Sequence, residues 1–251
     1  LPLHSALCGP YIAEYGNAEQ KARFMPGIIS GELILAVAMT EPGAGSDLAG
    51  MRTTAVDKGD HFELHGSKVF ISNGILADVV IVAAKTDPAN KHAMGLFLVE
   101  RGMPGFERGR KLKKLGMHSQ DTAELFFNNV KVPKDMLVGE LNGGWKLITA
   151  QLNHERLGLG SWSDKTVALY RRVLLWAKAQ DENGRRAIDA PWVRSLLAEC
   201  YARLEAMRLI NFRIAADLER GQMDVALAST TKVYGSESAV EILKRLSEVV
   251  G

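Results

Sequence analysis

The run from Met39 to Asp47, Met-Thr-Glu-Pro-Gly-Ala-Gly-Ser-Asp, is the stretch of this sequence best suited to bind an anion. It follows a short apolar run, so a strand is expected to lead directly into a turn. Gly43 and Gly45 can adopt backbone conformations that let successive N–H groups converge on an anion. Thr40 and Ser46 add hydroxyl donors on either side. An ordinary tight turn is the alternative, because short glycine motifs often occur by chance.

Glu155 is the candidate residue for proton transfer, because it lies on an otherwise apolar face of a predicted helix. The other members of this face are Ile148, Leu152, Leu159 and Trp162. Burial raises the pKa of an unpaired carboxylate toward the pH at which it can act as a general base. The alternative is a structural ion pair, in which Arg156 or a basic group on another helix neutralises the charge.

The remaining reactive side chains give weaker indications of a functional site than Glu155 does. The six histidines show no metal-ligand spacing with cysteine or acidic residues, so no metal site is predicted. The only cysteines, Cys8 and Cys200, fit a reducing compartment without a disulfide framework. Ser46 does not lie in a nucleophile elbow. Phe70 and Ser72 lie two residues apart on a predicted strand and therefore share a face. They are ordinary barrel residues unless a planar ligand lies against that face.

Composition limits the classes of partner. The chain has 251 residues, a formal charge of +2 and 47% hydrophobic residues, enough for a large buried core in one or two domains. The nearly balanced charge argues against nucleic acid. The basic run from Arg108 to Lys114 is interpreted as a solvated loop, with a site for a phosphorylated ligand or an acidic protein as the alternative. No stretch is apolar enough to span a membrane. Because the start at Leu1 lacks a signal-peptide pattern and an initiator Met, we expect a piece of a longer chain.

The chain changes its hydrophobic period twice. Residues 1–31 read as helical fragments, and from Glu32 short apolar runs alternate with turn residues, which predicts strands. The expected strands are 34–39, 53–56, 61–65, 68–72, 79–84, 94–100 and 124–130. Their spacing without intervening helices predicts an antiparallel barrel or sandwich. A dinucleotide-binding Rossmann unit is excluded, because strand residues rather than a long helix follow the glycines.

From Gly144 onward the apolar residues recur with helical spacing and predict three long helices in an antiparallel bundle. On the first helix, Leu169, Val173 and Trp176 continue the face that contains Glu155. The sequence therefore predicts an α+β multidomain fold. Its parts are a helical N-terminal remnant at 1–33, an antiparallel β-barrel or sandwich middle domain at 34–140, and a C-terminal helical bundle at 141–251 whose last helix is missing.

These residues resemble the acyl-CoA dehydrogenases, and most closely their long-chain and isovaleryl-CoA branches. The similar segments follow in the same order and are Tyr15 to Lys21, Met39 to Asp47, Gly66 to Gly74, Asp121 to Phe127, and Val130 to Pro133. The resemblance implies a flavoenzyme with a helical N-terminal domain, a β middle domain and a C-terminal four-helix bundle. It also implies that the middle domain binds FAD and an acyl-CoA.

The resemblance also implies roles for single residues. The residues implied at the FAD are Met39, Thr40, Ser46, Phe70, Ile71 and Ser72. Phe70 takes the place of an aromatic ring that packs on the isoalloxazine, and Ser72 that of a hydroxyl residue near flavin N5. Those implied at the substrate are Ser46 and Thr86 at CoA, with Asn153, His154 and Arg156 around the acyl group. Glu155 begins a Glu-Arg-Leu sequence that supplies the base in these branches, which favours it over the structural ion pair.

The implied activity is α,β-dehydrogenation of an acyl-CoA to the trans-2-enoyl-CoA in fatty-acid β-oxidation, with an electron-transferring flavoprotein as the electron acceptor. The expected assembly is a homodimer or homotetramer, in the bacterial cytoplasm or the mitochondrial matrix. One segment departs from the family, whose Arg-x-x-Phe-Gly reaches the FAD of a neighbouring subunit; here only Arg185 or Arg186 could substitute. Two alternatives follow, a non-catalytic or FAD-poor subunit of a hetero-oligomer and a flavin oxidase or monooxygenase on the same fold.

Overall fold

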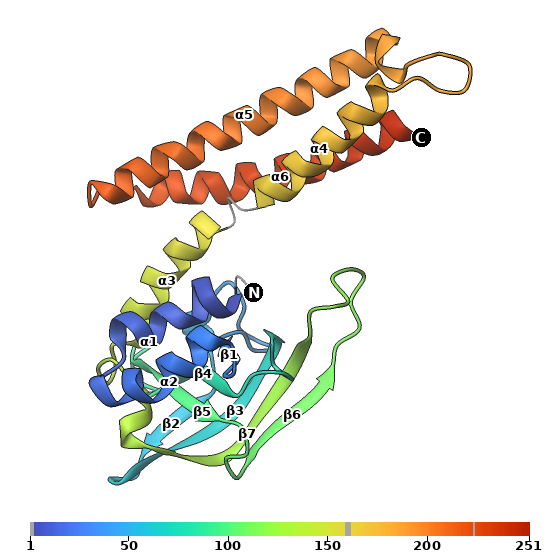
Figure 1. Cartoon of the computed structure of the whole chain (residues 1–251). Coiled ribbons are helices and arrows are strands. Elements are labelled where there is room, and N and C mark those ends of the chain that lie inside the picture. The colour runs from blue at the N-terminus through green and yellow to red at the C-terminus, as the bar shows by residue number, and fades with distance from the viewer. Residues whose placement is uncertain (1–2, 159–161, 223) are drawn as a thin grey trace. The chain divides into compact units, whose positions relative to one another are not determined.

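A computed structural model describes residues 3–158, 162–222 and 224–251 of the chain, with only the backbone described at 153–158, 162–164, 218 and 225. The chain forms two compact units, Leu1–Gln151 and Leu152–Gly251. The first contains helices and a sheet, and the second consists of helices (Figure 1). The α+β class and the order of helices, sheet and helices are confirmed.

The first unit begins with helices that are fastened to the sheet. They are η1 (Leu3–Cys8), α1 (Gly9–Tyr15) and α2 (Ala18–Ser30). Asn17 and Gln20 form a capping box at the start of α2, in which each side chain accepts a hydrogen bond from the other's backbone N–H. The Gln20 amide also donates to the carbonyls of Asp135 and Leu137, at 2.6 and 2.9 Å. Gln20 therefore both caps the start of α2 and holds this helix against the sheet.

The sheet of the described chain has eight strands. They are β1 (Leu35–Ala38), β2 (Thr54–Asp57), β3 (His61–Ser72), β4 (Val79–Lys85), β5 (Met94–Glu100), β6 (Phe106–Lys111), β7 (Thr122–Pro133) and β8 (Leu137–Val138). The order is β6-β7-β3-β2-β4-β5-β8, and β1 pairs with β4. Most pairs are antiparallel, as predicted, but β1 and β2 run parallel to β4, so the sheet is mixed. Apolar alternation reports which face of a strand is buried and not its direction, so the sequence pattern could not show this.

The predicted strands 61–65 and 68–72 are one continuous strand, β3. The pairing of β3 with β7 shifts at Gly66, which has a φ of 148°. A Cβ atom on Gly66 would lie 2.7 Å from the Cα of Thr53, so the strand passes this backbone too closely for any side chain. Gly66, which looks like a strand break in the sequence, is therefore the point at which β3 touches the backbone of Thr53.

The loop predicted for the basic run is partly wrong, because Arg108, Arg110 and Lys111 lie in strand β6. This strand is at one end of the sheet order, and β7 is its only partner among the described strands. Charged side chains are common on such edge strands, where they discourage pairing with another chain. The run lacks the apolar alternation of a half-buried strand, and the sequence therefore did not reveal it.

The second unit is built from long helices, and α3 contains the division between the units. The elements are α3 (Gly144–Gly158), α4 (Trp162–Lys178), η5 (Ala187–Asp189), α5 (Pro191–Glu219) and α6 (Val225–Val250). Their shared core includes Val173, Ala177, Val193, Leu197, Cys200, Leu204, Ile242, Leu246 and Val249. The apolar residues that recur with helical spacing along α5 and α6, such as Val193 and Leu197 on α5 and Ile242 and Leu246 on α6, are thus buried. On α4 the prediction is wrong for Leu169 and Trp176, which are 37% and 50% exposed, while Tyr170 and Ala177 face the core. No described helix has both the length and the apolar character needed to cross a membrane.

The close approach at Gly66 predicts that Gly66→Ala lowers the free energy of unfolding by about 2 kcal/mol or more, because backbone strain and overpacking both act. Gly59→Ala is the matched control, since Gly59 also has a positive φ, of 95°, but no described atom lies within 4 Å of its Cβ position. Urea unfolding of both variants measures the difference. Equal destabilisation would show that the contact with Thr53 contributes nothing.

Candidate active site

The glycine turn presents backbone donors to solvent. Glu41 and Ala44 close it through two hydrogen bonds of 2.9 and 3.1 Å. Gly43 and Gly45 do not have the positive φ that the sequence suggested, and a Cβ at either would meet no described atom within 4 Å. Among the described residues, none accepts a hydrogen bond from the N–H of Gly45 or Ser46. The protein's own packing therefore does not require glycine here, whereas a ligand that approaches the backbone closely would.

Phe70 occupies a β-bulge in β3. Val69 and Phe70 together lie opposite Glu124 alone in β7, because the pairing shifts between Lys68 and Ile71. Phe70 has a φ of 61°, and its side chain is 66% exposed. A non-glycine residue in the left-handed region costs on the order of 1–3 kcal/mol, and such residues cluster at functional sites. The bulge thus holds an aromatic ring in solvent at an energetic cost.

The two residues after Phe70 have different environments. Ile71 is 3% exposed, so its side chain belongs to the core and any ligand contact would come from its backbone. Ser72 is half-buried and pairs with Thr122 of β7. The following turn is held by Asp121, whose carboxylate accepts a 2.7 Å hydrogen bond from the N–H of Ile75. Ser72 therefore lies between a strained bulge and a fixed turn.

A buried ion pair lies between the glycine turn and the bulge. The Lys68 Nζ is 2.9 Å from the Glu41 Oε1, and the two side chains are 0% and 6% exposed. Burial lowers the pKa of Lys68, and the charge of Glu41 opposes this shift. Burial also disfavours ionisation of Glu41, but the charge of Lys68 and hydrogen bonds from Thr53, Lys68 and Arg52 outweigh it, so the pKa of Glu41 lies below its ordinary value. Glu41 is therefore ionised at neutral pH.

Hydrogen bonds join the end of β1 to the bulge. The Lys68 ammonium donates to the carbonyl of Met39 at 3.0 Å, and the N–H of Val69 donates to the carbonyl of Thr40 at 2.9 Å. The structure thus brings Met39 and Thr40 next to the segment that carries Phe70. Both are half-buried, and Ser46 lies beyond them on the exposed turn.

Thr86 follows β4 and connects to the same network. The N–H of the preceding residue, Lys85, donates to the carbonyl of Thr53 at 2.8 Å. The N–H of Thr53 in turn donates to Glu41 at 3.0 Å. The hydroxyl of Thr86 donates to the side-chain oxygen of Asn142. Thr86, one of the two candidate CoA residues, is therefore connected to Met39 and Thr40 through its neighbour Lys85, through Thr53 and through the Glu41 carboxylate.

The predicted substrate residues of α3 cannot be placed at the side-chain level. Asn153, His154, Glu155 and Arg156 lie in the helical backbone of α3, and their side chains are outside the described residues. Of the two arginines that could substitute for the family's FAD-binding arginine, Arg186 forms hydrogen bonds of 2.8 and 3.1 Å with Asp189.

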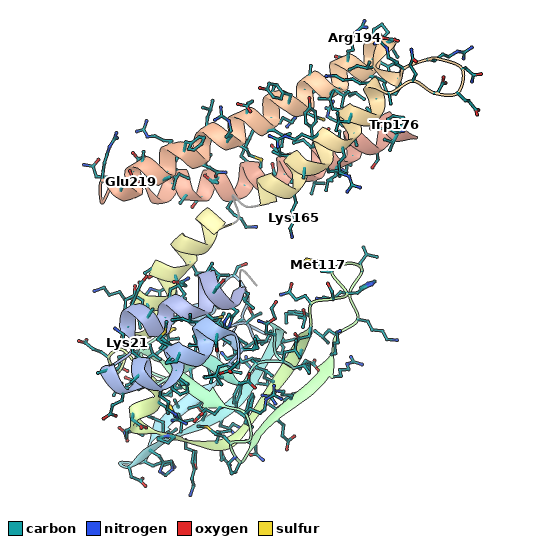
Figure 2. The ribbon with its side chains drawn as sticks, in the orientation of Figure 1. Lys21, Met117, Lys165, Trp176, Arg194 and Glu219 are labelled. Atoms are coloured by element: carbon teal, nitrogen blue, oxygen red, sulfur yellow. The ribbon has the colours of Figure 1, made fainter. Side chains whose placement is uncertain are left out.

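The loop between β6 and β7 carries the rest of the basic run, and Met117 lies in this loop (Figure 2). The Lys114 ammonium donates to the carbonyl of Gln120 at 2.7 Å and to the Thr122 hydroxyl at 2.9 Å. This lysine therefore stabilises the loop itself. No cluster of His, Cys, Asp or Glu that could hold a metal ion is found in the described part of the chain.

Comparison with known proteins accounts for the order of these elements. Family models of acyl-CoA dehydrogenases match in succession: the N-terminal domain at residues 1–32, the middle domain at 36–130 and the C-terminal domain at 142–251. This chain belongs to the acyl-CoA dehydrogenase family. All of the candidate flavin residues fall within the match to the middle domain.

Individual members of the acyl-CoA dehydrogenase family are similar over almost the whole chain. The mitochondrial long-chain specific acyl-CoA dehydrogenase of Sus scrofa is 41% identical over 239 residues, 94% of this chain and 56% of the relative. The crystal structure of an acyl-CoA dehydrogenase from Geobacillus kaustophilus superposes with a TM-score of 0.94 at 40% identity, covering 99% of this chain and 67% of that one. An FAD complex of PigA gives a TM-score of 0.94 at 28% identity, covering 99% and 66%. The chain thus spans little more than half the length of the pig enzyme.

The sequence patterns did not reveal that Glu41 and Lys68 form a buried ion pair. Both residues lie inside the segments that resemble acyl-CoA dehydrogenases, yet 27 positions separate them, so local patterns could not pair them. The one available signal was a lysine within a strand whose neighbours are mostly apolar, which calls for a buried partner.

The bulge predicts opposite effects of one substitution on stability and on ligand binding. Phe70→Gly should raise the free energy of unfolding of the cofactor-free protein by about 1 kcal/mol, because glycine adopts a φ of 61° without strain. The same change should weaken binding of a planar ligand, because the exposed ring is lost.

Asn129→Gly is the matched control, since Asn129 is exposed in β7 with a φ of 50°. It should change stability in the same direction, by less, and leave ligand binding unchanged. Thermal unfolding and FAD titration measure the two effects. A cofactor-free Phe70→Gly protein that is clearly less stable than wild type would contradict the assignment of strain.

Proposed function

We propose that this protein is an FAD-dependent acyl-CoA dehydrogenase that converts an acyl-CoA to its trans-2-enoyl-CoA. The observation that carries the proposal is Phe70, whose ring is exposed and whose backbone is strained. The N–H of the preceding residue, Val69, donates to the carbonyl of Thr40, at the strand end that leads into the glycine turn. Family membership supports the proposal. So does the long-chain name of the pig relative.

The residues present fit FAD. The proposed flavin residues are Met39, Thr40, Ser46, Phe70, Ile71 and Ser72. Phe70 offers a flat apolar surface for the isoalloxazine, and the glycine turn offers N–H donors and space for an anionic group. Ile71 would contribute through its backbone, since its side chain is buried. When bound, FAD supplies the hydride acceptor, flavin N5.

The proposed substrate site uses Ser46 and Thr86 for the CoA part of the thioester. Ser46 is exposed and Thr86 is half-buried, so a ligand can reach both hydroxyl groups. Asn153, His154 and Arg156 are proposed to surround the acyl thioester, as the resemblance implies. Hydrogen bonds to the thioester carbonyl would acidify the α carbon before its proton is removed.

Glu155 is the proposed base that removes the α proton. In the described part of α3, Ile148 and Gln151 are 0% and 5% exposed, and both precede Glu155 on the same helical face. If Glu155 is buried as well, its desolvated carboxylate is a stronger base than one in water. A pairing with Arg156 is the competing role, and it would lower the basicity of the carboxylate.

The proposed partners follow from the chemistry and the relatives. A reduced flavin must pass on its electrons, and an electron-transferring flavoprotein is the proposed acceptor. The protein is proposed to act as a homodimer or homotetramer, in the mitochondrial matrix or the bacterial cytoplasm. Named relatives come from both sources, the pig enzyme being mitochondrial and the Geobacillus enzyme bacterial.

Glu155→Gln in the full-length protein tests the proposed base. The variant should keep its FAD and lose substrate-dependent flavin bleaching by about a hundredfold or more, because the amide cannot accept the α proton. Anaerobic stopped-flow absorbance with a series of acyl-CoA thioesters measures the rate and reveals the preferred chain length. Glu237→Gln, an exposed glutamate in α6, is the control and should bleach like wild type. Wild-type bleaching by Glu155→Gln would assign the base to another residue.

A flavin oxidase is the second candidate function. FAD binding alone does not separate an oxidase from a dehydrogenase, because the two differ in which acceptor takes the electrons of the reduced flavin. An oxidase would consume oxygen at the rate at which it consumes acyl-CoA, whereas a dehydrogenase would do so only slowly and would reduce an electron-transferring flavoprotein instead. The missing Arg-x-x-Phe-Gly segment is the reason to test an FAD-poor subunit as well, which would need a related chain for activity.

A further inference from the structure

We propose that Glu41 and Lys68 are positioning residues for the flavin, and that their buried ion pair sets the spacing between Thr40 at the end of β1 and the bulge at Phe70. This inference rests on the proposed binding of FAD. Neither side chain is exposed enough to be a principal cofactor contact, since they are 6% and 0% exposed. Their effect would be exerted through the backbone segments they hold.

The two segments are joined by consecutive residues on both sides. Lys68 donates to Glu41 at 2.9 Å and to the carbonyl of Met39 at 3.0 Å, and its Nζ lies 3.9 Å from the Met51 sulfur. Val69, the next residue of β3, donates its N–H to the carbonyl of Thr40, which lies between Met39 and Glu41 in the chain. Residues 39–41 are therefore bonded to β3 at the point where the bulge begins.

The carboxylate of Glu41 organises the other side of the network. Its two oxygens accept from the N–H groups of Arg52 and Thr53, at 2.6 and 3.0 Å, in addition to Lys68. The carbonyl of Thr53 accepts from Lys85, the residue before Thr86. A glutamine could not replace Glu41 without turning its NH₂ group toward one of these donors, because only one amide atom is an acceptor.

General energetics argue that this pair has a role beyond stability. Replacing a buried ion pair with well-packed apolar residues is often neutral or stabilising, because both charges lose their hydration. Here, however, the Met39 carbonyl after β1 and the N–H groups of Arg52 and Thr53 before β2 find their partners in this pair. The pair satisfies these groups without covering Met39 and Thr40, which both stay half-buried. By contrast, the ion pair of Lys134 with Asp57 of β2 lies at the surface, with side chains 35% and 52% exposed.

Lys68→Met in the full-length protein tests the proposal. Methionine replaces the aliphatic part of the lysine side chain but leaves Glu41 buried without its cation and the Met39 carbonyl without its donor. The dissociation constant for FAD should rise about tenfold or more, and the visible circular dichroism of the bound flavin should change, because the two segments separate. Glu41→Gln should produce the same two effects, and it provides the test if Lys68→Met does not fold.

Val132→Ala is the matched control. Val132 is fully buried and pairs with Phe62, at the opposite end of the β3–β7 pairing from the bulge. Its loss should lower the unfolding temperature while leaving FAD affinity and the flavin spectrum as in wild type. If Lys68→Met and Glu41→Gln bind FAD no more weakly than Val132→Ala, the ion pair is only structural and the inference is wrong. Wild-type protein that fails to bind FAD would instead overturn the proposed function.

Discussion

A lysine ammonium without contact to water must keep its acceptors close, and in this protein that requirement organises the candidate site. Lys68 is fully buried and has Glu41 and the Met39 carbonyl as its nearest acceptors. Because these acceptors lie at the end of β1, the strand end cannot move away from β3 without exposing or orphaning a charge. The glycine turn, the bulge and the end of β4 all connect to this contact.

The bulge next to Lys68 stores strain that the surrounding sheet offsets. Phe70 has a left-handed backbone although it is an aromatic residue, and its ring is mostly exposed. Folding alone favours neither feature. A glycine at this position would relieve the backbone strain, and a polar side chain would be better suited to solvent than an aromatic ring. A planar cofactor explains both at once, because it needs an aromatic surface at a fixed place and covers that surface when bound.

Much of this fold is encoded in local patterns. Apolar spacing identified the cores of α5 and α6, and turn residues separated most of the strands. Features that depend on contacts between distant segments were not predictable, namely the parallel pairing of β1 with β4, the polar edge strand β6 and the pairing of Glu41 with Lys68. The left-handed φ of Phe70 was not predictable for the same reason, because it depends on the register between β3 and β7, two segments that are far apart in the sequence. Resemblance named Phe70 as a flavin residue, whereas only the structure shows how its backbone is held.

The most direct test of this account is an FAD titration of the deflavinated full-length protein, followed by isothermal calorimetry and visible absorbance. The account predicts saturable binding of roughly one FAD per chain, with the shifted absorbance of a flavin held in an apolar site. It also predicts a negative heat-capacity change, since the ring of Phe70 would be buried on binding. Absence of saturable binding under conditions in which the protein is folded would contradict it.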